Sequence, residues 1–307
     1  MIDILLASYN GEKYIAEQID SILNQTYKDW FLYIKDDCST DNTVKIIMDY
    51  EKKYKDKIKV ILSDKPSGSA KNNFFSMFEY SNSDYIMTCD QDDVWLPDKI
   101  KITLEGMKEA EQENKNIPIL VHTDLKVVDE NLNVFSDSLF KMQNLDNERY
   151  KLNYLLTQNI VTGCTVMANK ALLNHTKINP NDAIMHDWWM ALIAASLGKI
   201  IFIDKATVMY RQHERNSVGA KNVRSINYIK VKISNIDNIK KSIKDTYIQA
   251  EKLLEAIGAF LNSNNYDTIQ QYSLMKNNRK TKKIYTMVKY KYWKKGLIRN
   301  LGQVILA

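Results

Sequence analysis

Three carboxylates lie within four positions of the chain, at Asp90, Asp92 and Asp93, directly after the apolar residues 85 to 87. Like charges this close repel one another, so their placement at the end of a strand indicates a bound cation. Asp90 and Asp92 form an Asp-x-Asp pair, which can coordinate Mg²⁺ or Mn²⁺ while a diphosphate and water take the remaining positions. We therefore expect a divalent metal here. A solvated turn is the alternative on spacing alone.

A second acidic pair, Asp36 and Asp37, follows an earlier apolar run. Ser39, Thr40 and Asp41 after it are ordinary helix caps, but capping does not account for the preceding pair. A carboxylate at Asp37 can accept a hydrogen bond from the ring N–H of a uracil or thymine base. We expect this loop to contribute to a nucleotide site.

The stretch "MHDWW" places Asp187 between a histidine and two tryptophans at the start of an apolar helix. A carboxylate beside large aromatic rings is partly desolvated, which raises its pKa and suits it to act as a base. The alternative, favoured by spacing alone, is a helix cap without chemistry.

The cationic candidates are Lys71, Arg211 and His213. Lys71 lies in the small-residue loop "SGSAKNN", either as a diphosphate contact or as part of a surface loop. Arg211 and His213 occupy alternate positions of an expected strand, so both face the same side and can neutralise a diphosphate. Polar outward residues of an edge strand are the alternative. The chain lacks the G-x-G-x-x-G and Walker patterns, which argues against a dinucleotide dehydrogenase and a P-loop enzyme.

Strands and helices alternate over the first 120 residues, which predicts a parallel sheet covered on both faces. The predicted strands are residues 2–8, 30–35, 58–62 and 84–89. Ligands of such sheets bind outside the carboxyl ends of the strands. The loops at those ends are residues 7–10, 35–39, 63–71 and 89–95.

The second half mixes strands and helices without strict alternation. We expect an extended segment around Gly163 and a buried helix over 186–197, and from about Ser225 onward the pattern is helical and polar. The further predicted strands lie within 118–137, at 199–204 and at 207–213. This half should extend the sheet and form the second wall of a cleft.

The charge of the chain is uneven. Ten of its 43 Lys and Arg residues lie in 268–307, which holds no Asp or Glu, so this tail carries +10 and the rest carries 33 minus 37, or −4. Cys38, Cys89 and Cys164 are odd in number and scattered, which argues against a disulfide framework and a zinc site. Because no signal peptide or membrane-spanning run is evident, we expect a cytoplasmic protein.

Several segments together resemble, in order and spacing, the family 2 glycosyltransferases with the GT-A fold. They are "ASYNGEKYIAEQIDSILNQTYKDW", "KDDCSTDNT", "CDQDDVWLPDKI", "TGC" and "MHDWW". The resemblance is greatest to bacterial rhamnosyltransferases of cell-wall and capsular polysaccharide synthesis. It implies an α/β GT-A catalytic domain over 1–220, with a Rossmann-like, mostly parallel sheet flanked by helices, and a basic helical region over 221–307.

The resemblance also implies roles for individual residues. Asp187 is the catalytic base, Asp92 is the stronger metal ligand, and Asp90 lies nearer the ribose and sugar. Asp37 accepts from the base. The other residues implied in donor binding are Ala7, Ser8, Tyr9, Arg211, His213 and Ser217. Many relatives have Glu-Asp where this chain has His186 and Asp187, which leaves the role of His186 open.

The reaction that this resemblance implies is an inverting displacement with Mg²⁺ or Mn²⁺ as cofactor. The implied donor is dTDP-L-rhamnose, with a UDP-hexose as the alternative. The implied acceptor is a hydroxyl of a growing lipid-linked cell-wall or capsular polysaccharide.

The basic tail bears on where such an acceptor would be met. Its apolar side chains form one stripe at Tyr290, Trp293, Leu297, Leu301, Val304 and Ile305, flanked by Lys and Arg. A basic amphipathic helix of this kind predicts peripheral binding to the inner face of the cytoplasmic membrane. The alternative is that these helices pack on the catalytic domain and expose a Lys-rich face.

Two other classes of protein are weighed against this one. A sugar-phosphate nucleotidyltransferase needs a Gly-rich N-terminal loop with Arg and Lys, which "LLASYNGEKY" lacks. A nucleic-acid binder using the basic tail predicts a salt-sensitive affinity for RNA or DNA. It leaves the acidic cluster without a purpose, so we expect no nucleic-acid partner.

Overall fold

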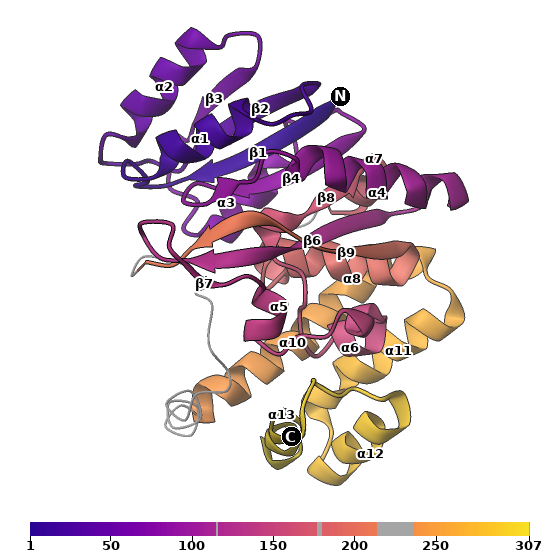
Figure 1. Cartoon of the computed structure of the whole chain (residues 1–307). Coiled ribbons are helices and arrows are strands. Elements are labelled where there is room, and N and C mark those ends of the chain that lie inside the picture. Colours follow the sequence, from indigo (N-terminus) through magenta and orange to yellow (C-terminus); the bar gives the residue numbers. More distant parts are fainter. Residues whose placement is uncertain (115, 177–179, 214–235, 307) are drawn as a thin grey trace.

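The computed structural model of the chain describes residues 1–114, 116–176, 180–213 and 236–306 (Figure 1). Within them, nine strands form one sheet in the order β3-β2-β1-β4-β8-β6-β9-β5, with β7 paired to β6. β3 and α2 lie at one end of the molecule, and the C-terminal helices α12 and α13 lie at the other.

The first four long strands form the parallel half of the sheet, as the alternating pattern predicts. They are β1 (Ile2–Ser8), β2 (Trp30–Asp36), β3 (Ile58–Leu62) and β4 (Tyr85–Asp90). The register pairs Ala7 with Asp90 and Ser8 with Asp36, so the carboxyl ends of β1, β2 and β4 meet at one edge.

Helices cover both faces of this half. They are α1 (Ile15–Leu23), α2 (Thr43–Lys53), α3 (Ala70–Met77) and α4 (Lys99–Glu113). One apolar core takes Ile4 of β1 together with residues of α1, α2 and α4. The other takes Leu5 of β1 together with residues of α3. Successive residues of a strand point to opposite faces, so an almost continuous apolar run serves both cores.

The second half of the sheet is mixed. Its strands are β5 (Val94–Trp95), β6 (Ile119–Val128), β7 (Val134–Ser136), β8 (Met167–Asn169) and β9 (Lys199–Arg211). β8 runs antiparallel to both β4 and β6, whereas β9 runs parallel to β6. The predicted strands 199–204 and 207–213 are one strand, β9, because the pairing with β6 shifts register at Thr123 and Asp124 and continues.

The helix α8 (His186–Leu197) precedes β9 and is buried on almost all sides, with Trp189 fully enclosed. The shorter elements around it are α5 (Leu139–Met142), α6 (Leu152–Leu155), α7 (Lys170–His175) and the 3₁₀ turns η1 (Asn147–Tyr150), η2 (Gly163–Thr165) and η3 (Pro180–Asp182). The segment around Gly163, expected to be extended, contains the turn η2 before β8 begins.

The C-terminal part is helical, as expected, although its predicted start near residue 225 lies outside the described residues. It comprises α10 (Ile236–Ile257), α11 (Ser263–Leu274), α12 (Lys280–Tyr290) and α13 (Leu297–Leu306), with the turns η4 (Gly258–Phe260) and η5 (Met275–Asn277). Tyr272, Met287 and Tyr292 are buried in the core that contains Trp189. Among the described helices, none has the length and apolar character needed to cross a membrane.

Candidate active site

Asp90 ends strand β4 at the edge where the carboxyl ends of β1 and β2 also lie. Burial and, to a smaller extent, the negative charges of Asp92 and Asp187 together raise the pKa of Asp90 to about 7. Carboxylates from two distant segments therefore act on one another at this edge. Such uncompensated negative charge is the electrostatic environment that a divalent cation would relieve.

Asp92 lies in the loop between β4 and β5 with its carboxylate directed at His213. The Nε2 atom of His213 is 2.7 Å from Asp92 Oδ2, and both side chains are mostly buried. The His213 ring also packs against Tyr14, with the ring centroids 5.0 Å apart. The structure thus brings together two of the predicted donor-binding residues from segments more than 100 positions apart.

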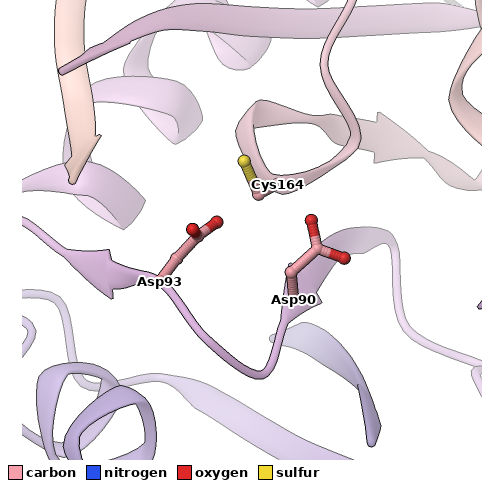
Figure 2. A group of neighbouring side chains, drawn as sticks. All are labelled: Asp90, Asp93 and Cys164. Atoms are coloured by element: carbon pink, nitrogen blue, oxygen red, sulfur yellow. The ribbon is translucent and has the colours of Figure 1, made fainter. Parts of the chain in front are cut away.

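Asp93, the third carboxylate of the group, is fully buried. Its Oδ1 accepts a hydrogen bond from the backbone N–H of Arg211 at 3.1 Å. Ligand atoms of Asp90, Asp93 and Cys164 lie within 4.8 Å of one another (Figure 2). Burial raises the pKa of Cys164 well above its ordinary value, so this side chain is a thiol beside the two carboxylates.

The residues present fit the expected ion. Mg²⁺ and Mn²⁺ prefer oxygen ligands, and Asp90 and Asp92 offer carboxylates at the strand end. Asp93 accepts from the backbone of β9 through Oδ1 alone, so its carboxylate also offers an oxygen beside Asp90, whereas the protonated Cys164 is a softer donor suited to other metals. The sequence alone did not predict that Cys164 lies beside Asp93 and Asp90. The "TGC" segment, which contains Cys164, was the part of the sequence that pointed to this turn.

Arg211, at the end of β9, is almost completely buried. Its Nε donates to the backbone oxygen of Asp92 at 2.8 Å, Nη1 donates to the backbone oxygen of Glu130, and Nη2 pairs with the Glu17 carboxylate. The guanidinium also lies over the Tyr14 ring, 4.5 Å from its centroid. In this structure Arg211 therefore holds the Asp92 loop in place through a hydrogen bond to its backbone. The contact of Arg211 with a diphosphate stays a prediction.

Asp187 is the second residue of α8, and Met185 occupies the cap position. Asp187 is therefore not the N-cap residue of α8, although its side chain accepts from a backbone N–H of the first turn. The side chain is 9% exposed, and its Oδ1 accepts from the Trp188 backbone N–H at 2.6 Å. Burial raises the pKa of Asp187 to about 6 against the opposing effect of hydrogen bonds that favour the charged form. A carboxylate of this kind is ionised at neutral pH and more basic than an exposed one.

His186 is buried beside Asp187 and stacks on Phe74 of α3, with ring centroids 4.0 Å apart. Neither ring nitrogen has a hydrogen-bond partner among the described residues. Burial lowers the pKa of His186 to about 3, so the ring is neutral. A Cβ added at Gly163 would lie 2.8 Å from His186 Nε2, which explains the need for glycine in this turn.

The expected nucleotide end is formed by β1, β2 and the loop before α3. Ser8 Oγ donates to Asp36 Oδ1 at 3.0 Å, and Asp37 accepts from both the N–H and the hydroxyl of Ser67, at 2.6 and 2.8 Å. Tyr9 is 55% exposed, and Gln91 holds its backbone through two hydrogen bonds of 2.9 Å.

Three other predicted residues have different outcomes. Lys71 Nζ donates to the backbone oxygen of Ala183 at 2.8 Å, so it ties α3 to the segment just before α8. Burial lowers the pKa of Lys71. Ser217 lies outside the described residues. Ala7 lies near the carboxyl end of β1, where it pairs with Asp90 of β4.

Comparisons with known proteins agree with this arrangement. The family model of glycosyl transferase family 2 matches residues 3–174. The dTDP-rhamnosyl transferase RfbG of Shigella flexneri is 32% identical over 227 residues, covering 70% of this chain and 74% of that protein. The glucosyltransferase WfgD of Escherichia coli, named for a UDP-Glc donor and a GlcNAc-diphosphoundecaprenol acceptor, is 25% identical over 57% of this chain and 62% of its own length.

Solved structures show the same fold. S. aureus TarS residues 1–349 in complex with UDP-GlcNAc superimposes with a TM-score of 0.57 at 18% identity, covering 94% of this chain and 80% of that one. The mannosyltransferase PcManGT of Pyrobaculum calidifontis, in complex with GDP-Man and Mn²⁺, gives 0.55 at 12% identity, covering 99% and 85%. With a family match over more than half of its length and a relative above 30% identity, the chain belongs to glycosyl transferase family 2.

Proposed function

We propose that this glycosyltransferase is a metal-dependent, inverting enzyme that moves L-rhamnose from dTDP-L-rhamnose to a hydroxyl of a growing lipid-linked cell-wall or capsular polysaccharide. The observation that carries the proposal is that the turn η2 lies between Asp187 and the end of β4. Asp90 lies beside Cys164 of this turn, a Cβ at Gly163 would lie 3.8 Å from Asp187 Cβ, and the charge of Asp187 raises the pKa of Asp90. A base and a metal-binding pair placed together are what a single displacement requires.

Asp187 is the residue that takes the proton of the acceptor hydroxyl. Its pKa of about 6 leaves the carboxylate ionised at neutral pH and basic enough to accept a proton as the oxygen attacks. The Trp188 N–H donates to Oδ1 and holds the side chain in place. One carboxylate is sufficient for attack on the face opposite the leaving diphosphate, which inverts the anomeric centre.

Asp92 and Asp90 would hold Mg²⁺ or Mn²⁺, which when bound stabilises the charge of the departing diphosphate. His213 contacts the Asp92 carboxylate and orients it. The structure of PcManGT in complex with GDP-Man and Mn²⁺ supports the same ion type here. Arg211 fixes the loop that carries Asp92 through its contacts with backbone oxygens.

The identity of the nucleotide sugar donor rests on the similarity to known relatives. The similarity to RfbG supports dTDP-L-rhamnose, whereas the similarity to WfgD supports a UDP-hexose as the second candidate. Asp37 does not separate the two, because uracil and thymine present the same ring N–H. The acceptor of WfgD, GlcNAc-diphosphoundecaprenol, supports a lipid-linked acceptor.

A donor hydrolysis panel tests the proposal. It compares dTDP-L-rhamnose, UDP-glucose, UDP-galactose and UDP-N-acetylglucosamine, each with Mn²⁺ and with a chelator. We expect turnover of dTDP-L-rhamnose at least tenfold above the UDP sugars and its loss in the chelator. A faster UDP sugar would establish the second candidate, and equal rates in the chelator would contradict the metal assignment.

A further inference from the structure

The apolar stripe of the C-terminal tail is divided between two faces in the structure. The tail does not form one continuous helix. The chain turns between α12 and α13, where Lys291 and Gly296 take positive φ values of 58° and 96°. Trp293 and Val304 pack against the protein core. By contrast, Leu297, Leu301 and Ile305 are 82%, 61% and 65% exposed. Because these three are four residues apart on one helix, they form a continuous apolar strip on its surface.

The strip is held in place by contacts on the other side of the tail. Arg149 Nη1 donates to the backbone oxygen of Trp293 at 2.6 Å, and Lys295 Nζ donates to that of Leu145 at 2.9 Å. Gln303 reaches back to the oxygen of Tyr292 at 3.1 Å. These anchors fasten α13 and the segment before it to the region around α5 and α6, so the fold itself presents the three aliphatic side chains to solvent.

The surroundings of the strip are strongly cationic. Residues 268–307 hold ten Lys or Arg and no acidic residue. Arg279, Lys282 and Lys291 are exposed, and in the described part of the chain none of them forms an ion pair. Lys280 at the start of α12 donates to the backbone oxygen of Ile305, which places the basic start of α12 beside the end of the strip.

We infer that the α13 strip, formed by Leu297, Leu301 and Ile305, docks on an anionic lipid bilayer, with α13 lying in the plane of the interface. Exposed apolar side chains on a strongly cationic tail, with Lys280 beside Ile305, match a surface with acyl chains below anionic headgroups. A second copy of the chain matches less well, since two tails of +10 would repel one another. The inference builds on the proposed lipid-linked acceptor, which such docking would bring within reach.

Cosedimentation of the full-length protein with vesicles tests the inference. Vesicles of phosphatidylglycerol and phosphatidylethanolamine are compared with vesicles of phosphatidylcholine at 50 and 500 mM salt. The wild type should bind the anionic vesicles, and high salt should weaken the binding. The triple variant Leu297→Ser, Leu301→Ser, Ile305→Ser should bind at least tenfold more weakly. The variant Arg279→Gln, Lys282→Gln, Lys291→Gln should bind about a hundredfold more weakly, at about fivefold for each cation.

Matched controls remove equivalent side chains elsewhere. Val134→Ser with Phe135→Ser removes two exposed apolar residues of β7, and Lys52→Gln, Lys53→Gln, Lys55→Gln removes three exposed cations of α2 and the turn after it. Both should bind like the wild type. Deleting the tail is a poorer test, because Tyr272, Met287 and Tyr292 belong to the core. Thermal melting of each variant verifies that it folds.

Three outcomes would overturn the inference: equal binding to anionic and neutral vesicles, full binding by the serine variant, or equal losses in the controls. Loss of a dimer in the serine variant, without vesicle binding by the wild type, would assign the strip to a second copy and overturn it as well. Vesicle binding needs no turnover, so its failure leaves the proposed transferase reaction standing. Failure of the donor panel likewise leaves the docking result standing.

Discussion

At the scale of single residues, the proposed role of Asp187 as the base predicts opposite effects on turnover and on stability. Substitution to Asn keeps its shape and removes its ability to take a proton, so turnover should fall by about 10² to 10⁴-fold while donor affinity stays close to that of the wild type. Initial rates and nucleotide binding, measured on the same preparation, separate the two effects. Full turnover in this variant would remove Asp187 from the role of base.

The same substitution should stabilise the fold. Burial places the folded-state pKa of Asp187 at about 6, above the ordinary value of 3.8. The stability that its protonated form contributes is complete below pH 3.8 and is lost as the pH rises through about 6. At 1.36 kcal/mol for each pKa unit, Asp187→Asn should raise the free energy of unfolding at pH 7.5 by up to about 3 kcal/mol. Denaturant titrations at pH 4 and 7.5 measure the difference, which should shrink at pH 4.

Turnover should depend on pH through the same group. The base must be deprotonated, so the rate should rise tenfold per pH unit below about pH 6 and level off above it. The residual rate of Asp187→Asn should lack this rise. A wild-type rate that is flat between pH 5 and 7, with the protein folded throughout, would contradict the assignment.

At the scale of elements, the turn η2 and the start of α8 approach each other closely at Gly163. Gly163→Ala would place a methyl group 2.8 Å from His186 Nε2 and displace the histidine that precedes the base. We expect a loss of about 1–3 kcal/mol in stability together with reduced turnover. Gly302→Ala on α13 is the control, since its added Cβ meets nothing within 4 Å and should be neutral or slightly stabilising. Equal effects of the two would refute the close approach.

Strand β9 contributes to the site through the donors of Arg211. A lysine cannot reproduce three separate donations to Asp92, Glu130 and Glu17, so Arg211→Lys should loosen the Asp92 loop and leave a buried ammonium with fewer partners than the guanidinium has. A loss of about 2–4 kcal/mol in stability and weaker Mn²⁺ binding are expected. Lys205→Gln, an exposed change on the same strand, serves as the reference and should alter neither quantity. Unchanged Mn²⁺ binding in Arg211→Lys would contradict the fastening role.

The strands also show which features of the fold could be predicted from the sequence and which could not. The parallel strands were predictable because their apolar runs end at polar loops, and their register then forces Ala7 beside Asp90. The continuity of β9 was not, because a register shift opposite Asp124 lets the polar residues at 204 and 205 stay within one strand. The proximity of Cys164 to Asp93 could not be predicted, because the two residues are far apart in the sequence and only the folded sheet brings them together.

At the scale of the whole molecule, one sheet unites the residues that a family 2 glycosyltransferase would use, and the C-terminal helices α10 and α11 pack against α8 and α6. The core containing Trp189 is shared by the sheet, α8 and the tail, so the helix that carries Asp187 is held by residues from most of the chain. The uneven charge follows the same division, with carboxylates at the strand ends and cations in residues 268–307.

The central claim is that the strand-end carboxylates hold a divalent ion together with a nucleotide diphosphate. Anomalous diffraction from crystals grown with dTDP and Mn²⁺ tests it most directly. We predict a single manganese peak bound by the Asp92 carboxylate and the diphosphate, with the thymine ring near Asp37. A nucleotide bound elsewhere, or no manganese at Asp90 and Asp92, would contradict the account.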